Sequence, residues 1–137
     1  GAVVNCCKEA PPRELYQKLG LQAIWIPFDD GVPFGPELHA VFIRAFEFVS
    51  EELGAGKNVL VHCRAGVSRS SAFMASYLFW SGAEPTFDKA FRRVRTAHPI
   101  TLPHFDILAS FQELLGLAAD REVYIEFWQK EMVKRGY

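Results

Sequence analysis

The sequence has few cysteines and no long apolar run, and both absences narrow the class of protein. Only three cysteines occur among 137 residues, and two of them, Cys6 and Cys7, are adjacent. An odd number of cysteines, with no signal-peptide pattern at the start, argues against a disulfide framework and indicates a reduced intracellular protein, cytoplasmic or nuclear. No apolar stretch approaches the roughly 18 residues that a membrane crossing needs, so we expect no membrane span.

An excess of one charge and clusters of metal-binding residues are also missing. The formal net charge of −1 gives no basis for a nucleic-acid-binding or membrane-binding surface. No CxxC pair and no His/Cys cluster at zinc spacing occurs, so we expect no metal site. Apolar residues, in contrast, make up 50% of the chain, with 12 phenylalanines and 3 tryptophans. This composition predicts an ordered interior and a single domain over residues 1–137.

Continuous apolar runs predict three strands, over residues 2–7, 21–28 and 57–63. Such runs, unlike alternating ones, are typical of parallel strands covered on both faces. Between the last two strands, apolar residues at three- and four-residue steps predict a helix from Pro36 to a cap at Gly54. Further helices are predicted over 70–82, 86–98 (N-cap Thr86), 103–116 and 120–136 (N-cap Asp120). The predicted fold class is therefore α/β, with helices packed on a small sheet.

The stretch VLVHCRAGVSRSS, residues 59–71, leads a buried strand directly into a cysteine. Between Cys63 and a helix that starts near Ser70 lie only the six residues RAGVSR, namely Arg64, Ala65, Gly66, Val67, Ser68 and Arg69. Their backbone N–H groups can form a nest for a tetrahedral oxyanion, and the helix N-terminus adds partial positive charge. The same surroundings favour the thiolate, commonly lowering a cysteine pKa into the range of about 3.5–7.5.

Two further side chains of this stretch suit phosphoryl chemistry. The Arg69 guanidinium is a planar fork that matches two phosphoryl oxygens, and Ser70 can donate a hydrogen bond to the sulfur as it leaves. Nucleophile, anion clamp and nest together indicate phosphoryl transfer through a cysteinyl-phosphate. The alternative is a packing cysteine, as most buried cysteines are. A Cys-to-Arg spacing alone also occurs in arsenate reductases and low-molecular-weight phosphatases.

The segment HCRAGVSRS resembles the HCxxGxxR[ST] signature of the protein tyrosine phosphatase superfamily. Its AGxSRS form resembles the dual-specificity phosphatases, and VVNCC, YLFW and PITLPHFDIL extend the likeness over residues 1–117. The resemblance implies a three-layer sandwich with a small, mostly parallel central sheet. It also implies a cysteine nucleophile, neither metal nor cofactor, and a phosphorylated protein substrate, for example a kinase. Phosphotyrosine and phosphoserine or phosphothreonine would both be accepted.

The family also places an aspartate general acid on a loop before the long helix. The stretch PFDDGVPFGPEL offers Asp29 and Asp30, and we favour Asp30 because it lies one residue further from the strand end. It would protonate the leaving oxygen and then act as base on water. His62 matches the family's histidine and is expected to order the loop through hydrogen bonds. Arg64 faces the substrate or is a solvated surface arginine.

Some positions depart from the family pattern. His98 stands where the family often has Arg, and His104 where it has Asn, which puts a second basic pocket in doubt. The arginines at 92, 93 and 95 either compensate or form a solvated helix face. The chain begins inside the family's second or third strand, so either the sheet is smaller or an N-terminal strand lies outside these residues.

Several alternatives stay open at the level of sequence. The substrate could instead be a phosphoinositide or another non-protein phosphate monoester, or the chain could be a weakly active phosphoprotein-binding pseudophosphatase. Cys6 and Cys7 either pack in a strand or form a reversible disulfide with oxidised Cys63. The helix predicted over 120–136 exceeds the family's usual extent, and its aromatic stripe is interpreted as core. No oligomeric state is predicted.

Overall fold

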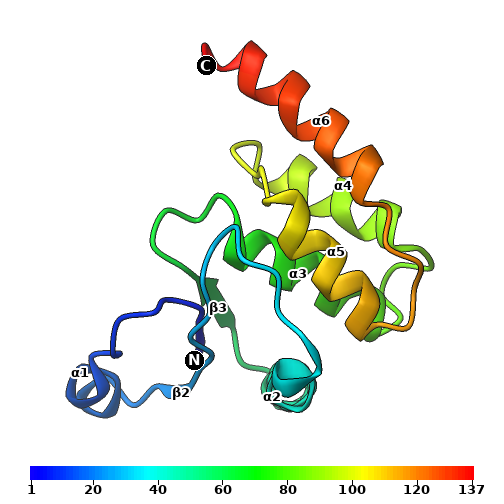
Figure 1. Cartoon of the computed structure of the whole chain (residues 1–137). Helices are drawn as coiled ribbons and strands as arrows, with labels where there is room; N and C mark the ends of the chain where they lie inside the picture. The colour runs from blue at the N-terminus through cyan, green and yellow to red at the C-terminus, as the bar shows by residue number, and fades with distance from the viewer.

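The protein has a parallel sheet of three strands. A computed structural model describes residues 1–137 (Figure 1). The strands are β1 (Ala2–Asn5), β2 (Gln22–Trp25) and β3 (Val59–His62), in the spatial order β2-β1-β3. Both pairs are parallel, with Val4 opposite Ile24 on one side and Val61 on the other. Strand β1 is buried along its whole length, whereas β2 and β3 form the partly exposed edges.

The predicted strands are present, but all three end earlier than predicted, β3 by one residue, at His62 rather than at residue 63. β1 ends at Asn5 rather than at residue 7, and β2 at Trp25 rather than at residue 28. The Asn5 side chain explains the early end of β1, because its Oδ1 accepts a 2.9 Å hydrogen bond from the Cys7 backbone N–H. This local bond turns the chain out of the sheet.

The helices are α1 (Arg13–Lys18), α2 (His39–Gly54), α3 (Arg69–Trp80), α4 (Phe87–Ala97), α5 (Phe105–Leu114) and α6 (Arg121–Lys134), with the 3₁₀ turn η1 (Pro36–Leu38) before α2. Helix α1 was not predicted, because six residues are too few to display a helical period. Thr86 caps α4 as predicted, accepting a hydrogen bond from the Lys89 N–H. The Asp120 side chain makes no cap bond, and the left-handed glycine after α2 is Gly56, not Gly54.

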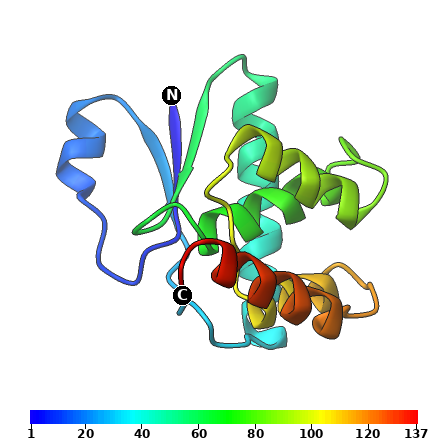
Figure 2. The ribbon, with the colours of Figure 1, turned by 90° about the horizontal axis from the view of Figure 1, so that it is seen from above.

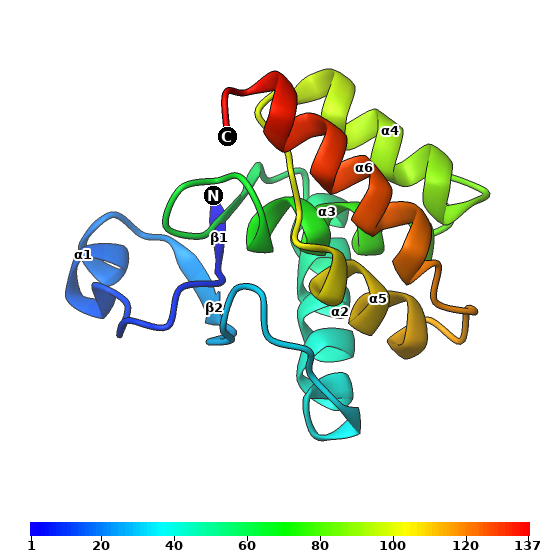
Figure 3. The ribbon, with the colours of Figure 1, turned by 45° about the horizontal axis from the view of Figure 1, so that its top comes forward.

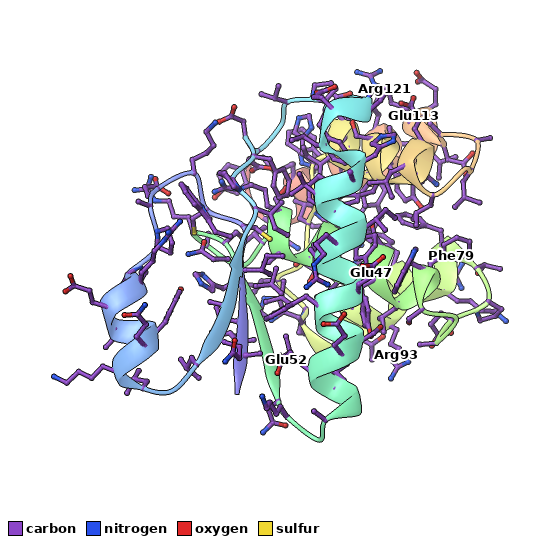
Figure 4. The ribbon with its side chains drawn as sticks, turned by 90° about the horizontal axis from the view of Figure 1, so that it is seen from below. Glu47, Glu52, Phe79, Arg93, Glu113 and Arg121 are labelled. Carbon is purple, nitrogen blue, oxygen red and sulfur yellow. The ribbon has the colours of Figure 1, made fainter.

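The sheet has helices on both faces, which confirms the predicted three-layer sandwich. Ala2 and Val4 contribute to the core shared with α2 and α3. Asn5 faces the other side, where Tyr16 of α1 places its hydroxyl 3.4 Å from both Asn5 Nδ2 and His62 Nε2. Figure 2 shows α1 on one side of the strands and the remaining helices on the other. Figure 4 shows α2 running beside the strands, with Glu47 on its outer side.

The core is built mainly from phenylalanines, and it anchors one particular loop. Phe28 and Phe34 both pack against Phe42 of α2, with ring centroids 5.1 and 4.7 Å apart, and Phe34 also contacts Phe111 of α5 at 5.0 Å. All four rings are buried. Because Phe28 and Phe34 flank the segment 29–33, which we call the aspartate loop, the core holds this loop at both ends.

Helix α6 packs on α4 and α5, as Figure 3 shows. Tyr124 is buried, and Phe127 lies edge-to-face against Phe91 of α4 with centroids 5.5 Å apart. The Arg95 guanidinium lies 4.5 Å from the Phe127 ring centroid. The predicted aromatic stripe is therefore largely core. None of the helices combines the length and the apolar character that a membrane crossing requires.

Candidate active site

The turn after β3 together with Arg69, the first residue of α3, makes up residues 63–69, which we call the cysteine loop. Gly66 has φ +69°, a left-handed conformation that a residue with a side chain rarely adopts. Its carbonyl oxygen lies 2.8 Å from His98 Nε2, so this ring nitrogen carries the proton and donates. The Val67 carbonyl accepts a 2.9 Å bond from the Leu102 N–H. The loop is thus held from outside by the segment that joins α4 to α5.

Cys63 lies at the start of this loop, where the strand ends, and it is only 9% exposed. Its sulfur is 3.3 Å from Ser70 Oγ. Burial opposes ionisation of this thiol, but hydrogen bonds from the Ser70 side chain and the backbone N–H groups of Ser70 and Gly66 favour it. With the nearby Arg69 charge, these groups hold the pKa of Cys63 below its ordinary value. The site therefore favours a thiolate.

Arg69 is held by backbone carbonyls in the segments that follow the other two strands. Its Nη1 donates to the Phe28 carbonyl at 3.1 Å and to the Cys6 carbonyl at 3.4 Å. Parallel strands bring these carbonyls to the same edge of the sheet as Cys63. The guanidinium is therefore positioned by backbone atoms, beside the thiolate that it stabilises.

The two candidate aspartates occupy different surroundings. Asp30 lines the cleft above Cys63, and its Oδ1 accepts a 2.5 Å hydrogen bond from Ser68 Oγ. Asp29 does not line the cleft. Its side chain is 56% exposed and lies 3.6 Å from the Lys8 ammonium. The geometry thus favours Asp30, which faces the space where a phosphate ester would lie.

A cleft of about 340 Å³ opens above the cysteine loop. Eleven residues line it: Asp30, Cys63, Arg64, Ala65, Val67, Ser68, Arg69, Leu102, His104, Trp128 and Met132. Ser70, which contacts the sulfur, and His62, which contacts Tyr16 of α1, do not line the cleft. A larger hollow of about 440 Å³ lies between α1 and β2. It contains no cysteine, histidine or carboxylate, the groups that the predicted phosphoryl transfer needs.

His62 lies in a network that supports its expected ordering role. Its Nε2 is 3.4 Å from the Tyr16 hydroxyl and its Nδ1 is 3.4 Å from the Cys63 carbonyl oxygen. Cys7 Sγ lies 4.0 Å from the same Nδ1. Cys6 is fully buried, and burial raises the pKa of its thiol well above the usual range. All three cysteines are free.

The arginine run of α4 forms ion pairs rather than a second anion pocket. Arg92 pairs with Asp88 at 3.0 Å, and Arg93 with Glu84 at 3.4 Å. Figure 4 shows Arg93 at the periphery of the molecule. Arg95 pairs with Glu131 of α6 at 3.5 Å. None of the three arginines lines the cleft. They therefore form a charged helix face, as one of the two interpretations has it, and do not replace the arginine that the family often has at the position of His98.

Three cleft residues were not identified from the sequence: Leu102, Trp128 and Met132. Leu102 follows the predicted helix 86–98 in a segment without periodic pattern. Trp128 belongs to the aromatic stripe of the helix predicted over 120–136, which the sequence interprets as core. Tyr124 of this stripe is buried as expected, whereas Trp128 is only partly buried and lines the cleft. The four-residue spacing of Trp128 and Met132 places them on one helix face, a signal that indicates a surface without saying what it covers.

The comparisons with known proteins agree with this geometry. The family model described as "Dual specificity phosphatase, catalytic domain" matches residues 1–114. The tyrosine-protein phosphatase vhp-1 of Caenorhabditis elegans is 33% identical over 88 residues, 64% of this chain and 13% of that protein. The dual specificity protein phosphatase Mpk3 of Drosophila melanogaster is 33% identical over 109 residues, 77% of this chain and 26% of that protein. The chain thus spans about a quarter or less of the length of these relatives.

Solved structures show the same fold. Human DUSP28 superimposes with a TM-score of 0.68 at 24% identity, covering 82% of this chain and 72% of that one. The structure titled "Tk-PTP in the active form" has a TM-score of 0.71 at 22% identity, covering 82% and 76%. At these identities the likeness concerns the fold. It confirms the α/β sandwich.

Proposed function

The chain belongs to the dual specificity phosphatase family, and we propose that it hydrolyses phosphotyrosine and phosphoserine or phosphothreonine in proteins through a cysteinyl-phosphate. One observation carries this proposal. The Cys63 sulfur meets the Ser70 hydroxyl and backbone N–H groups of the cysteine loop, which lower its pKa despite burial. A packing cysteine has no use for such stabilisation, whereas a nucleophile that must be anionic near neutral pH requires it.

In the first step the Cys63 thiolate attacks phosphorus on the side opposite the ester oxygen. An S–P bond forms while the P–O bond to the substrate side chain breaks. Asp30, which lines the cleft, transfers its proton to the departing oxygen, and the free alcohol or phenol leaves. The loop N–H groups and the Arg69 fork hold the phosphoryl oxygens throughout.

In the second step water attacks the cysteinyl-phosphate. The Asp30 carboxylate accepts the proton of that water, the S–P bond breaks, and inorganic phosphate is released. The electron pair returns to sulfur, where the Ser70 hydroxyl donates a hydrogen bond to the departing thiolate. Asp30 regains its proton and Cys63 its charge, so the cycle closes without a redox partner or a metal.

The substrate class follows from the cleft and the loop. The interior of the cysteine loop carries one cation besides Arg69, namely Arg64, which is exposed at the cleft. A site for highly phosphorylated inositol lipids would need more positive charge close to the phosphate. The proposed substrates are therefore intracellular phosphoproteins, a phosphorylated kinase among them.

Rapid-quench labelling tests the mechanism directly. We expect wild-type protein to release phosphate from matched phosphotyrosine and phosphothreonine peptides and to retain covalently bound label from ³²P-labelled substrate after a denaturing quench at neutral pH. Cys63→Ser should abolish both turnover and label, a loss of at least about 10³-fold. If the wild-type protein binds vanadate but neither turns over nor becomes labelled, the phosphatase proposal fails and a phosphoprotein-binding module replaces it.

A further inference from the structure

Helix α6 contributes a wall to the active-site cleft, although it lies outside the residues 1–114 that match the family model. Trp128 and Met132, one helical turn apart, line the same cleft as Cys63 and Asp30. Figures 2 and 3 show the last turns of α6 approaching the loop that follows β3. Both side chains are only partly buried, so they leave apolar surface open toward the cleft.

This wall is rigidly attached. The Trp128 ring lies edge-to-face against Phe105, with centroids 5.7 Å apart, and 5.9 Å from the His104 ring. Arg135 is the residue that follows α6. Its guanidinium donates to the Ile100 carbonyl at 2.9 Å and to the Thr101 carbonyl at 3.4 Å. The helix is thus fastened to the segment that leads to the cleft residues Leu102 and His104. A fixed aromatic surface is pre-organised for binding, since little side-chain freedom remains to be lost.

Floor and wall of the cleft differ in chemistry. The floor carries the charged and polar groups that take up phosphate, and the wall consists of an indole ring, a thioether and Leu102. In an aryl phosphate the ring is bonded directly to the ester oxygen, so it lies just outside the phosphate, within the cleft that these apolar side chains line. Aromatic rings and thioethers both interact favourably with aromatic rings. A serine or threonine ester presents only one or two carbons there.

From this arrangement we propose that Trp128 and Met132 are specificity-determining residues that contact the ring of phosphotyrosine and favour it over phosphoserine and phosphothreonine. The proposal rests on the proposed phosphatase function and assigns α6 a part in it. Neither residue takes part in the chemical steps. Phosphate itself is held by the cysteine loop, which α6 does not contribute to.

Matched peptides that differ only in the phosphorylated residue provide the test. We expect Trp128→Ala to lower kcat/KM for the phosphotyrosine peptide about tenfold. The phosphothreonine peptide and inhibition by orthovanadate, a small oxyanion without a ring, should change less than about twofold. Trp128→Phe keeps an aromatic ring and should retain most of the preference, and Trp128→Ala combined with Met132→Ala should abolish it. Val133→Ala is the matched control, because Val133 is on the same helix and 71% exposed.

An equal loss on both peptides and on vanadate would overturn the proposal, because Trp128 would then only support the fold of the site. An unchanged ratio of the two kcat/KM values would overturn it as well. Circular dichroism and thermal unfolding show whether each variant is folded. If Trp128→Ala does not fold, the comparison of Trp128→Phe with the wild-type protein still tests the proposal.

A binding experiment separates this inference from the proposed catalysis. Cys63→Ser is titrated with both peptides, with and without Trp128→Ala. If the wild-type protein fails to turn over but Cys63→Ser prefers the phosphotyrosine peptide through Trp128, the phosphatase proposal fails and the specificity proposal stands. If wild type turns over but neither preference depends on Trp128, only the specificity proposal fails. If Cys63→Ser binds neither peptide and the wild-type protein does not turn over, both the phosphatase proposal and the specificity proposal fail.

Discussion

The hydroxyl of Ser68 donates a 2.5 Å hydrogen bond to Oδ1 of Asp30, although 38 positions separate the two residues. The same hydroxyl oxygen accepts a 2.9 Å bond from the His104 N–H. One buried serine of the cysteine loop therefore joins the aspartate loop to the segment before α5. This bond links the loop proposed to hold the phosphate to the group proposed to protonate the leaving oxygen.

Ser68→Ala should reduce kcat about tenfold, because Asp30 loses the partner that holds it over the cleft. The pKa of Cys63 should stay where it is, since Ser68 is not among the groups that lower it. Steady-state kinetics and the pH dependence of iodoacetamide alkylation measure the two effects. Ser68→Thr, which keeps the hydroxyl, should restore activity, and the exposed Ser81→Ala is the neutral control. A shifted alkylation profile in Ser68→Ala would contradict a role confined to Asp30.

The two aspartates should behave differently on mutation. Asp30→Asn removes the proposed proton donor and should lower kcat about 10²- to 10⁴-fold for phenyl phosphate. The loss should be much smaller for p-nitrophenyl phosphate, whose leaving group needs little protonation. Asp29→Asn, which removes only an exposed pair with Lys8, should be nearly neutral. A larger loss in Asp29→Asn would assign the acid to the other residue.

Ser70→Ala should shift the acidic limb of the pH–rate profile to higher pH. The thiolate fraction of Cys63 rises with pH through its pKa, and the Ser70 hydrogen bond is the strongest of the groups that lower this pKa. Its removal therefore raises the pKa, and less thiolate is present at any pH below it. The pH dependence of alkylation measures the shift. Ser76→Ala, whose hydroxyl bonds to the Ala72 carbonyl within the same helix, should leave the profile unchanged.

Phe42→Ala should destabilise the fold by about 3–5 kcal/mol, because a fully buried ring is removed from the core. Urea unfolding measures this loss. Val41→Ala, one position away and 40% exposed, should cost less than about 1 kcal/mol. Because Phe28 and Phe34 pack on Phe42, the aspartate loop should also become more susceptible to proteolysis than in the control. Equal stability of the two variants would contradict the assignment of Phe42 to the core.

Much of the fold could be predicted from sequence because its signals are local. The parallel strands are continuous apolar runs, and the long helices α2 to α6 display the helical period over ten or more residues. Helix α1 has six residues and no buried side chain, so it carries no such signal. The strand ends were misplaced for a similar reason, since the turn after Asn5 depends on a side-chain bond to Cys7 that hydropathy does not reveal.

The candidate site, like the fold, has one part that could be predicted from the sequence and another that could not. The sequence by itself determined the cysteine loop, because nucleophile, glycine, arginine and serine are neighbours in the chain between a strand and a helix. Only the tertiary structure decided which aspartate faces the cleft, since Asp29 and Asp30 are adjacent and differ only in what surrounds them. The tertiary structure also placed Trp128 in the same cleft as Cys63, because α6 packs on α5. A site formed by consecutive residues can be predicted from the sequence, because its groups are neighbours in the chain. Contacts between distant segments form only when the chain folds, so the sequence pattern does not reveal them.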